Sequence, residues 1–336
     1  MKRLKVGISG YGIVGKKRRE CVDENPHLDL VVVCDEKFVS EGVFDDGVKF
    51  YPSYEQIFNE QIDMLFVCMP NNIAPKVVKH ALKKSINTFC EKPPGRNLND
   101  ISEIIAEEKN SSAKLMYGFN HRYHDSVIKA IDISKSGLLG NIISMRGVYG
   151  KSKLITFNQT EWRTIRELAG GGILLDQGIH MVDLMRLFAG NFTDIHSFIS
   201  NDYWGYDVED NAYVLMKSDS GIVAMLNSSA TQWRHEFKLD ITFDKGALIL
   251  SGILSGSKSY GDERLTVIFS NESDNGNPIE KQYKYNKDLS WSREVDYFVD
   301  CILNNKSIRF STSKEAFQTM KLVEDIYKAD KSWNDS

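Results

Sequence analysis

Residues 4–15 read LKVGISGYGIVG, a mainly apolar run that ends in a glycine-rich loop. The run 4–8 has the length of a short buried strand, and the residues after Gly15 have the pattern of a helix. Between them, Gly10, Gly12 and Gly15 follow the spacing G-x-G-x-x-G. In such a loop the first glycine permits a tight turn, the second lets a pyrophosphate approach the backbone, and the third lets helix and strand pack closely. The stretch therefore predicts a dinucleotide-binding loop formed by Gly10, Tyr11, Gly12, Ile13, Val14 and Gly15.

An acidic residue at the end of the next predicted strand completes this pattern. The apolar run 28–34 is followed directly by Asp35. A carboxylate in this position accepts hydrogen bonds from the 2′-hydroxyl of a ribose. Together with Glu36, it would repel the 2′-phosphate that distinguishes NADP from NAD. We therefore expect Asp35 and Glu36 to contact the cofactor, and the cofactor to be NAD(H) rather than NADP(H).

Two other interpretations of the glycine loop compete with this one. Residues 10–16 also fit G-x-x-x-x-G-K, the start of an ATP-binding loop, but Lys17 stands where a Ser or Thr would hold Mg²⁺. A glycine-rich turn without a ligand is the second alternative, and the strand, the helix and Asp35 together argue against it. The basic run 16–19 could be taken as a phosphate site. On a helix its side chains fan around the circumference, which favours a solvated helix face.

The first 120 residues alternate short apolar runs with amphipathic stretches, the pattern of a parallel sheet covered by helices. The strand-like runs are 4–8, 28–34, 64–69, 88–90 and 115–119. Helical periodicity covers the residues after Gly15 and the approximate ranges 73–84 and 98–108. We expect residues 1–120 to form an α/β Rossmann domain with a doubly wound parallel sheet.

The order of predicted helices and strands changes after residue 120. Helical patterns at about 125–136 and 173–188 lie on either side of a strand-like run at 142–149. Further strand-like runs then follow one another without helices: 195–200, 212–217, 222–228, 237–243, 247–250 and 265–269. Two helical patterns, 291–304 and 313–329, close the chain. We expect residues 121–336 to form an α+β domain with an antiparallel or mixed sheet.

The composition excludes several classes of protein. Of the 336 residues, 42% are hydrophobic and 26% are charged, so the chain is not disordered. A net charge of −4 argues against a nucleic-acid binder, which needs clustered positive charge. The sequence has no run of about 18 apolar residues and no signal-peptide pattern, and its cysteines lack a Cys-x-x-Cys spacing. We expect a cytoplasmic protein with no nucleic-acid or membrane partner.

A set of motifs beyond the glycine loop follows in a fixed order along the chain. They are Glu91-Lys92-Pro93-Pro94, GFNHRY at 118–123, Glu161-Trp162-Arg163 and GGILLDQGIH at 171–180. Glu91-Lys92-Pro93 follows a short strand and so falls at the carboxyl edge of the predicted parallel sheet, where ligands bind. With these motifs the chain resembles the glucose-fructose oxidoreductase / inositol dehydrogenase family of NAD(P)-dependent sugar oxidoreductases. The resemblance covers essentially the whole chain.

The resemblance implies an architecture and a set of catalytic residues. Members of the family have a Rossmann domain followed by an α+β domain with a large open, mainly antiparallel sheet. That sheet often serves in oligomerisation, so we expect a homodimer or a homotetramer. The family's catalytic lysine, aspartate and histidine correspond to Lys92, Asp176 and His180. The Lys92–Pro93 peptide bond is often cis in such proteins.

The resemblance also implies positions that line the cofactor. They are Met69, Pro70, Asn71, Glu91, Lys92, Asn120, Arg122, Trp162 and Arg163. Trp162 and Arg163 could contact nicotinamide, ribose or substrate, or could be purely structural. Many relatives carry a histidine where Ala74 stands here, so a cofactor contact copied from that position is in doubt.

The chemistry of hydride exchange supports the catalytic residues independently. Oxidation of a carbinol requires removal of the hydroxyl proton, and an imidazole with an ordinary pKa of about 6.5 exchanges that proton near neutrality. Asp176 and His180 are four residues apart, so they would share one face of a helix. Lys92 could stabilise the developing alkoxide and share the proton relay.

The predicted activity is NAD-linked oxidation of a ring hydroxyl of a sugar, cyclitol or nucleotide-linked sugar, or the reverse reduction. The loop 151–162 and the aromatic stretch 203–206 could stack on a sugar or a base. The alternatives are a redox-neutral epimerase or glycosidase that retains NAD, and a non-catalytic regulator that binds NAD and a sugar. Two groups have spacings that metal ligands can also show, Asp176-His180-Asp183 and His121-His124. Because hydride transfer needs no ion, we expect no metal, and we assign His124 to the start of a helix.

Overall fold

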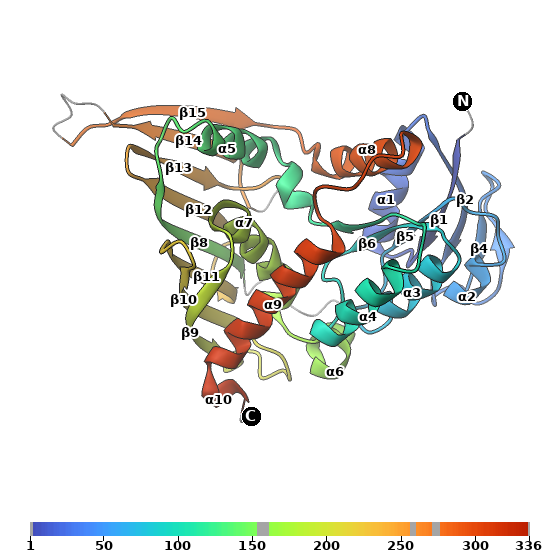
Figure 1. The fold of residues 1–336 in the computed structure, drawn as a ribbon. Helices are drawn as coiled ribbons and strands as arrows, with labels where there is room; N and C mark the ends of the chain where they lie inside the picture. Colours follow the sequence, from blue (N-terminus) through green and yellow to red (C-terminus); the bar gives the residue numbers. More distant parts are fainter. Residues whose placement is uncertain (1–2, 153–160, 256–259, 271–275, 335–336) are drawn as a thin grey trace. The chain divides into compact units, whose positions relative to one another are not determined.

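The computed structural model describes residues 3–152, 161–255, 260–270 and 276–334. Contacts divide the chain into two compact units (Figure 1). The first consists of residues 1–119, 167–170 and 291–317, and the second of residues 120–166, 171–290 and 318–336. The expected division treats the domains as consecutive blocks, 1–120 and 121–336, whereas two later segments return to the first unit. Residues 153–160 of the expected substrate loop lie outside the described residues.

The first unit is built around a seven-stranded sheet. Its strands lie in the order β3-β4-β2-β1-β5-β6-β7, and each neighbouring pair is parallel except β3 with β4. From β1 the chain order runs outward as β5, β6, β7 on one side and β2, β4 on the other, as in a doubly wound sheet, with the short strand β3 outside β4. The strands are β1 (Leu4–Ser9), β2 (Leu28–Cys34), β3 (Gly42–Val43), β4 (Lys49–Tyr51), β5 (Met64–Val67), β6 (Asn87–Glu91) and β7 (Leu115–Gly118).

Helices cover both faces of this sheet, with α1 and α8 on one face and α3 and α4 on the other (Figure 1). Strands β5 and β7 are buried along their whole length because neither face meets water. On α8, Phe298 packs edge-on against Phe89 of β6, with ring centroids 5.8 Å apart. The helices are α1 (Ile13–Glu24), α2 (Tyr54–Ile57), α3 (Ala74–Lys83), α4 (Leu98–Glu108) and α8 (Ser290–Leu303).

The second unit is built around an eight-stranded sheet in the order β15-β14-β13-β12-β8-β11-β10-β9. Each neighbouring pair is antiparallel except β8 with β11. The strands are β8 (Ile142–Ser152), β9 (Phe192–Ser200), β10 (Asn211–Ser218), β11 (Val223–Gln232), β12 (Glu236–Phe243), β13 (Gly246–Ser251), β14 (Glu263–Phe269) and β15 (Ile279–Tyr285). The predicted fold class is confirmed: a doubly wound parallel sheet followed by an open, mainly antiparallel one.

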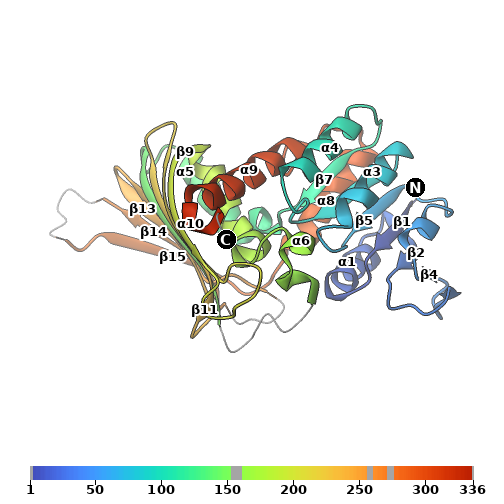
Figure 2. The ribbon, with the colours of Figure 1, turned by 90° about the horizontal axis from the view of Figure 1, so that it is seen from below.

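One face of this second sheet carries helices. α5 packs on β13, β14 and β15, and α7 packs on β8 and β11. Figure 2 shows α5 and α10 on the same side of the sheet. The helical elements are η1 (Asn120–Tyr123), α5 (Asp125–Lys135), η2 (Glu161–Thr164), η3 (Leu174–Gly178), α7 (Ile179–Ala189) and α10 (Lys331–Asn334). Two more, α6 (Arg166–Ala169) and α9 (Ser313–Ala329), have residues in both units.

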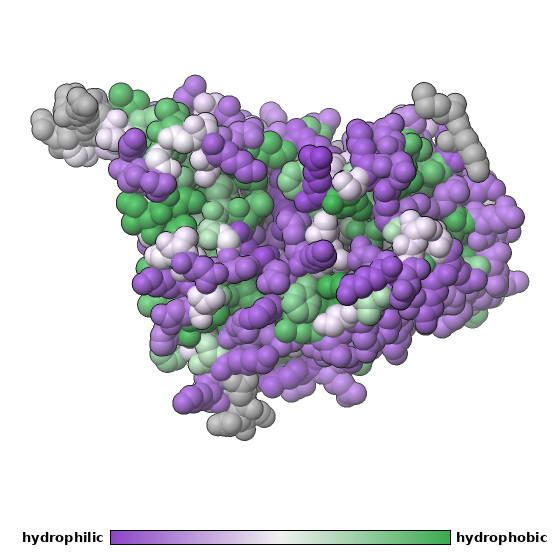
Figure 3. Space-filling model, viewed as in Figure 1, coloured by the Kyte–Doolittle hydropathy of each residue, from purple (hydrophilic) through white to green (hydrophobic). Residues whose placement is uncertain are grey.

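The opposite face of the second sheet exposes several large hydrophobic side chains. Strand β10 alternates buried and exposed residues, so one set of its side chains points away from the helices. This outward set includes Tyr213 and Leu215, and Phe198 and Met225 lie beside them on β9 and β11. Figure 3 shows that hydrophobic residues also gather on the second unit on the side seen in Figure 1. Among the described residues, no helix combines the length and the hydropathy that a membrane span requires.

Candidate active site

The glycine loop has the shape that a bound pyrophosphate requires. Gly10 has φ +89°, and a Cβ there would lie 2.3 Å from the carbonyl oxygen of Cys68. A Cβ at Gly15 would lie 2.0 Å from the carbonyl oxygen of Gly10. Both positions therefore admit only glycine. At Gly12, where α1 begins, no atom of the described residues lies within 4 Å of the Cβ position, so a ligand can approach the backbone there.

Asp35 is tied to this loop by a hydrogen bond. Its Oδ2 accepts from the backbone N–H of Tyr11 at 2.8 Å, and its Oδ1 accepts from the N–H of Lys37 at 3.1 Å. The carboxylate is half-buried at the end of β2, and Glu36 beside it is exposed. A hydrogen bond thus connects the Asp35 carboxylate directly to the glycine loop. The open space at Gly12 fits the dinucleotide that the sequence pattern predicts.

The solvated helix face expected for residues 16–19 is wrong for Arg18. Its side chain is fully buried, and its guanidinium contacts Glu91 Oε1 at 2.5 Å and Glu294 Oε1 at 2.6 Å. It also lies over the rings of Phe89 and Trp291, at 4.4 and 4.3 Å from their centroids. Opposite charges close to a guanidinium favour its charged form, and the pKa of Arg18 is raised although burial alone would lower it. Arg18 therefore joins α1, β6 and α8.

The buried Arg18 contacts the last residue of β6, which directly precedes Lys92. Glu91 is the last residue of β6, and its Oε1 also accepts from Nε of Arg18 at 2.6 Å. Lys92 comes next and is half-buried, and the Lys92–Pro93 peptide bond is cis, as expected. Lys92 thus lies at the carboxyl end of a central parallel strand, the edge at which such sheets bind ligands.

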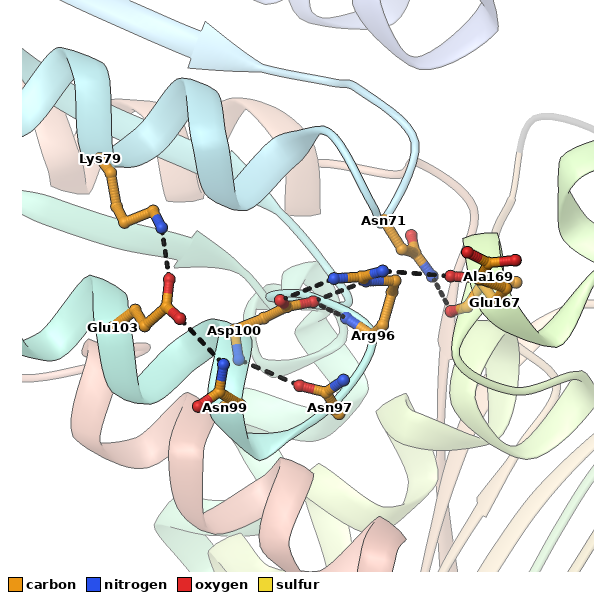
Figure 4. A network of polar contacts seen from close by, with 9 residues as sticks. All are labelled: Asn71, Lys79, Arg96, Asn97, Asn99, Asp100, Glu103, Glu167 and Ala169. Atoms are coloured by element: carbon orange, nitrogen blue, oxygen red, sulfur yellow. Dashed lines mark hydrogen bonds and ion pairs between the residues drawn. The ribbon is translucent and has the colours of Figure 1, made fainter.

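The turn after β5 is fastened to the returning segment 167–170. Nδ2 of Asn71 donates to the carbonyl oxygen of Ala169 at 2.7 Å. Nη1 of Arg96 donates to the carbonyl oxygen of Glu167 at 3.2 Å, while Asp100 holds its Nε at 2.9 Å (Figure 4). The amide nitrogen of Asn71 is therefore bonded within the first unit. Met69 and Pro70 precede it at the carboxyl end of the sheet and are half-buried.

Asp176 and His180 lie on consecutive helical elements of the second unit. Asp176 is part of the π-helical turn η3, and His180 is in the first turn of α7. The expected continuous α-helix over 173–188 is therefore corrected in its first part. A π-helical turn changes the angle between positions four residues apart, and such turns occur often at functional sites. Nε of Arg163 lies 3.8 Å from Oδ1 of Asp176. The guanidinium of Arg163 also lies over the ring of Trp162, with Cζ 4.5 Å from the ring centroid.

A buried carboxylate holds the start of this helical segment. Glu209 is fully buried and accepts from the N–H groups of Gly172 at 2.7 Å and Leu174 at 2.8 Å, and from the hydroxyl of Tyr327 at 2.8 Å. Burial raises the pKa of Glu209, although these three hydrogen bonds oppose that effect. A Cβ on Gly172 would lie 2.0 Å from the Glu209 carbonyl oxygen, so glycine is required there. The sequence interpretation did not identify this role of Glu209.

The 120–123 run is placed in the interior of the second unit. Arg122 is buried and bonds Asp183 of α7 through Nε at 2.6 Å and Nη2 at 2.7 Å. Asn120 is buried and bonds Ser290 and the neighbouring His121. The His121 ring in turn stacks on His180. Asn120 and Arg122, expected beside the cofactor, thus make internal contacts, and His121 was missed because spacing alone cannot show which rings stack.

Each unit therefore brings together part of the predicted site. The first holds the glycine loop, Asp35 and Lys92 at the carboxyl ends of its parallel strands, and the second holds Asp176, His180 and Arg163. No group of three or more His, Cys, Asp or Glu in the described part of the chain has the geometry of a metal site.

Comparison with protein families gives two matches. Residues 4–119 match the family described as "Oxidoreductase family, NAD-binding Rossmann fold". Residues 127–249 match the GFO/IDH/MocA C-terminal domain. The two matches follow each other in the order of the compact units described above.

Individual proteins resemble the chain over most of its length. A myo-inositol 2-dehydrogenase of Thermotoga maritima is 24% identical over 272 residues, which cover 78% of this chain and 79% of that protein. A D-glucoside 3-dehydrogenase of Escherichia coli K12 is 27% identical and covers 71% of this chain and 74% of its own length. A solved structure of levoglucosan dehydrogenase with NADH and L-sorbose superposes with a TM-score of 0.83 at 18% identity, covering 99% of this chain and 98% of that one. The structural match shows a shared fold.

Proposed function

Because this chain belongs to the GFO/IDH/MocA family of NAD-binding oxidoreductases, we propose that it transfers a hydride between NAD and a ring hydroxyl or keto group of a sugar, cyclitol or nucleotide-linked sugar. The observation that carries this proposal is the glycine loop. The loop leaves open space at Gly12, and Asp35 holds it in place by accepting a hydrogen bond from the backbone of Tyr11. The named relatives support the substrate class, since inositol 2-dehydrogenase and D-glucoside 3-dehydrogenase are both named for a ring position.

The three expected catalytic side chains have distinct roles in this proposal. In the direction of oxidation His180 takes the proton of the substrate hydroxyl. Lys92, as an ammonium, stabilises the negative charge that develops on the same oxygen. Asp176, close to Arg163, orients the substrate or the imidazole. NAD, when bound, accepts the hydride from the substrate carbon, so that carbon loses two electrons and the hydroxyl becomes a carbonyl.

An assay of reduced cofactor tests the reaction type. Purified protein is supplied with excess NAD⁺ and separate pools of cyclitols, aldoses, glucosides and nucleotide sugars, and the absorbance of NADH is followed. A dehydrogenase releases NADH over many turnovers. A redox-neutral epimerase or glycosidase would convert the sugar, seen by chromatography, without accumulating NADH. Conversion of a sugar without accumulation of NADH would therefore contradict the proposal that the protein catalyses a net oxidation.

The choice of NAD over NADP gives a quantitative prediction. Asp35→Ser is expected to weaken NADH binding by about 10-fold or more, because a hydrogen bond to a charged group contributes about 1.5–3 kcal/mol. The same change is expected to reduce the difference between the affinities for NADH and NADPH, since the negative charge that repels a 2′-phosphate is lost. Titration of cofactor fluorescence measures both affinities. Asp45→Ser, at an exposed acid of a neighbouring loop, is the control. Tighter binding of NADPH than NADH by the unaltered protein would contradict the role of Asp35.

We also propose that the apolar outer face of the second sheet pairs two copies of the chain. Phe198 is 78% exposed, and Tyr213, Met225 and Leu215 are about half exposed. These residues face one another across strands β9, β10 and β11 and line a depression of about 440 Å³. The other face of the same sheet is covered by helices of this unit. An apolar sheet face of this kind is typical of a subunit interface, which supports the expected homodimer or homotetramer.

Leu215→Glu tests this interface. A charge at the centre of the face is expected to weaken self-association by about 100-fold or more, an effect of the size found at the few central residues that dominate an interface. Sedimentation at several protein concentrations reads the oligomeric state. Leu303→Glu, a similarly exposed leucine at the end of α8, should leave that state unchanged. A Leu215→Glu protein that sediments like the original would exclude this face as the interface.

The cysteines support the proposed cytoplasmic location. All five are free thiols, and Cys21, Cys34, Cys90 and Cys301 are buried. Burial raises the pKa of Cys21 and of Cys34 to about 11, so both stay protonated and inert at neutral pH. A chain that keeps five reduced cysteines suits a reducing compartment.

A further inference from the structure

The rings of His121 and His180 lie face to face. Their centroids are 3.8 Å apart and their planes differ by 15°, and the two residues are 7% and 5% exposed. We propose that His121 is a positioning residue for His180: a neutral, hydrogen-bonded ring that fixes the plane of the His180 imidazole and leaves His180 as the member of the pair that takes the proton. This rests on the proposed function, which makes His180 the proton acceptor.

A chain of hydrogen bonds fixes the Nδ1 side of His121. The hydroxyl of Ser290 donates to Oδ1 of Asp288 at 2.7 Å, so its oxygen is left to accept. Nδ2 of Asn120 therefore donates to Ser290 Oγ, at 3.1 Å. The other end of the Asn120 amide, Oδ1, lies 3.1 Å from Nδ1 of His121 and can only accept. Nδ1 of His121 therefore carries a hydrogen.

A second set of contacts fixes the Nε2 side. Nε2 of His121 lies 3.0 Å from the hydroxyl oxygen of Tyr149. The amide of Gln177 hydrogen-bonds the same hydroxyl and lowers its pKa, which is the effect of a donor to the oxygen. Burial outweighs this and raises the pKa of Tyr149, so the hydroxyl keeps its hydrogen. That hydrogen has His121 Nε2 as its acceptor. A neutral ring with its hydrogen on Nδ1 therefore fits the contacts with both Asn120 and Tyr149.

The neutral state of His121 decides what His180 can do. Two cationic rings at 3.8 Å would repel each other enough to lower the second pKa by roughly 3, taking an effective dielectric constant of about 20. A protonated His121 would therefore prevent His180 from accepting a proton near neutral pH. A neutral His121 imposes no such barrier, and its face supports the imidazolium that forms on His180.

The titratable groups that the contacts of the described residues place near the two rings are paired or neutral. The pairs are Arg122–Asp183, His124–Glu263 and Arg163–Asp176, with N···O distances of 2.6, 2.8 and 3.8 Å. Burial raises the pKa of Tyr149 and of Tyr260, so both are neutral at the pH of interest. Phe237 of β12 completes the surroundings of His121 with an apolar ring at 5.7 Å. The contacts within the histidine pair therefore determine which of the two rings takes a proton.

Nitrogen-15 NMR of histidine-labelled protein reads the protonation of each ring nitrogen. It needs neither substrate nor cofactor, so its outcome is independent of any assay for dehydrogenase activity. His121→Asn and His180→Asn assign the two rings by loss of their signals. Between about pH 6 and pH 8, the range in which histidine usually titrates, we expect His121 to keep a protonated Nδ1 and a bare Nε2 while His180 titrates. A cationic His121 at neutral pH, or a hydrogen on its Nε2 alone, would overturn the proposal.

Tyr149→Phe tests the hydrogen bond that keeps His121 neutral. Without the hydroxyl, His121 is expected to titrate within the same range, and the apparent pKa of His180 is expected to fall by at least one pH unit. Tyr117→Phe is the control, because that buried hydroxyl in the first unit has no hydrogen-bond partner among the described residues. Unchanged titration of both rings in Tyr149→Phe would overturn the proposal.

A second variant covers the case in which Tyr149→Phe does not fold. His121→Phe keeps an aromatic ring beside His180 but cannot be protonated. If His121 is neutral in the unaltered protein, this change leaves the pKa of His180 within about half a pH unit. A rise of more than one pH unit would show that His121 had carried the charge, which contradicts the proposal.

Discussion

Replacement of Lys92 by methionine is expected to lower kcat by about 10²–10⁴-fold, the range typical of a side chain that assists proton transfer. Methionine keeps an unbranched stem of similar length but has neither a charge nor a proton to exchange. Because Lys92 is also expected to line the cofactor, NADH binding is expected to weaken, but by far less than kcat falls, since the larger effect is on the transition state. Steady-state kinetics with the substrate identified in the assay, and a titration of NADH fluorescence, measure the two quantities.

Two further variants at lysine positions sharpen this prediction. Lys92→Arg keeps the positive charge but cannot give up its proton near neutral pH, so any activity it recovers reports charge stabilisation alone. Lys83→Met, at an exposed lysine of α3, should leave kcat unchanged. Unaltered activity of Lys92→Met would show that the catalytic assignment is wrong.

Replacement of Arg18 by methionine is expected to lower the free energy of unfolding by about 3–5 kcal/mol, the usual effect of removing one partner of a buried ion pair. The guanidinium is fully buried against Glu91 and Glu294, so its loss leaves two carboxylates in the interior without their counter-charge. Unfolding in urea, followed by circular dichroism, measures the change.

A neighbour on the same helix provides the control. Lys17→Met removes an exposed pair with Glu20 and is expected to cost less than about 1 kcal/mol. The double variant Arg18→Met with Glu294→Met, which also removes the fully buried carboxylate, is expected to recover part of the loss. Equal effects of Arg18→Met and Lys17→Met would contradict the account of Arg18 as a buried anchor.

Much of the fold could be predicted because hydrophobic period and glycine placement are local properties. The run 4–8, the glycines after it and Asp35 specify a strand, a turn and the end of the next strand, and the structure places β1, α1 and β2 accordingly. Residues 291–317 were harder to assign, because nothing in a helical pattern shows which unit its apolar face will cover. That segment returns to the first unit, where Trp291 and Glu294 meet Arg18.

The catalytic residues could be named from the resemblance, whereas their supports could not. Arg18 was taken for part of a solvated face, although its spacing from Gly15 and Cys21 places it on the buried side of α1. Glu209 gave no signal, and His121 was noted only for its spacing from His124, since each acts through contacts between residues far apart in sequence. The π-helical turn at Asp176 was also invisible, because apolar spacing does not distinguish a local change of helical pitch.

A single-turnover experiment tests the central claim most directly. Protein in excess over NAD⁺ is mixed with each sugar pool, and the absorbance of NADH is recorded for the unaltered chain and for Lys92→Met. The account predicts that at least one pool reduces the bound NAD⁺ with the unaltered chain, and that Lys92→Met is slower by about 10²-fold or more. Saturable binding of NADH without reduction of NAD⁺ in any pool would contradict the account and would favour a nucleotide-binding regulator.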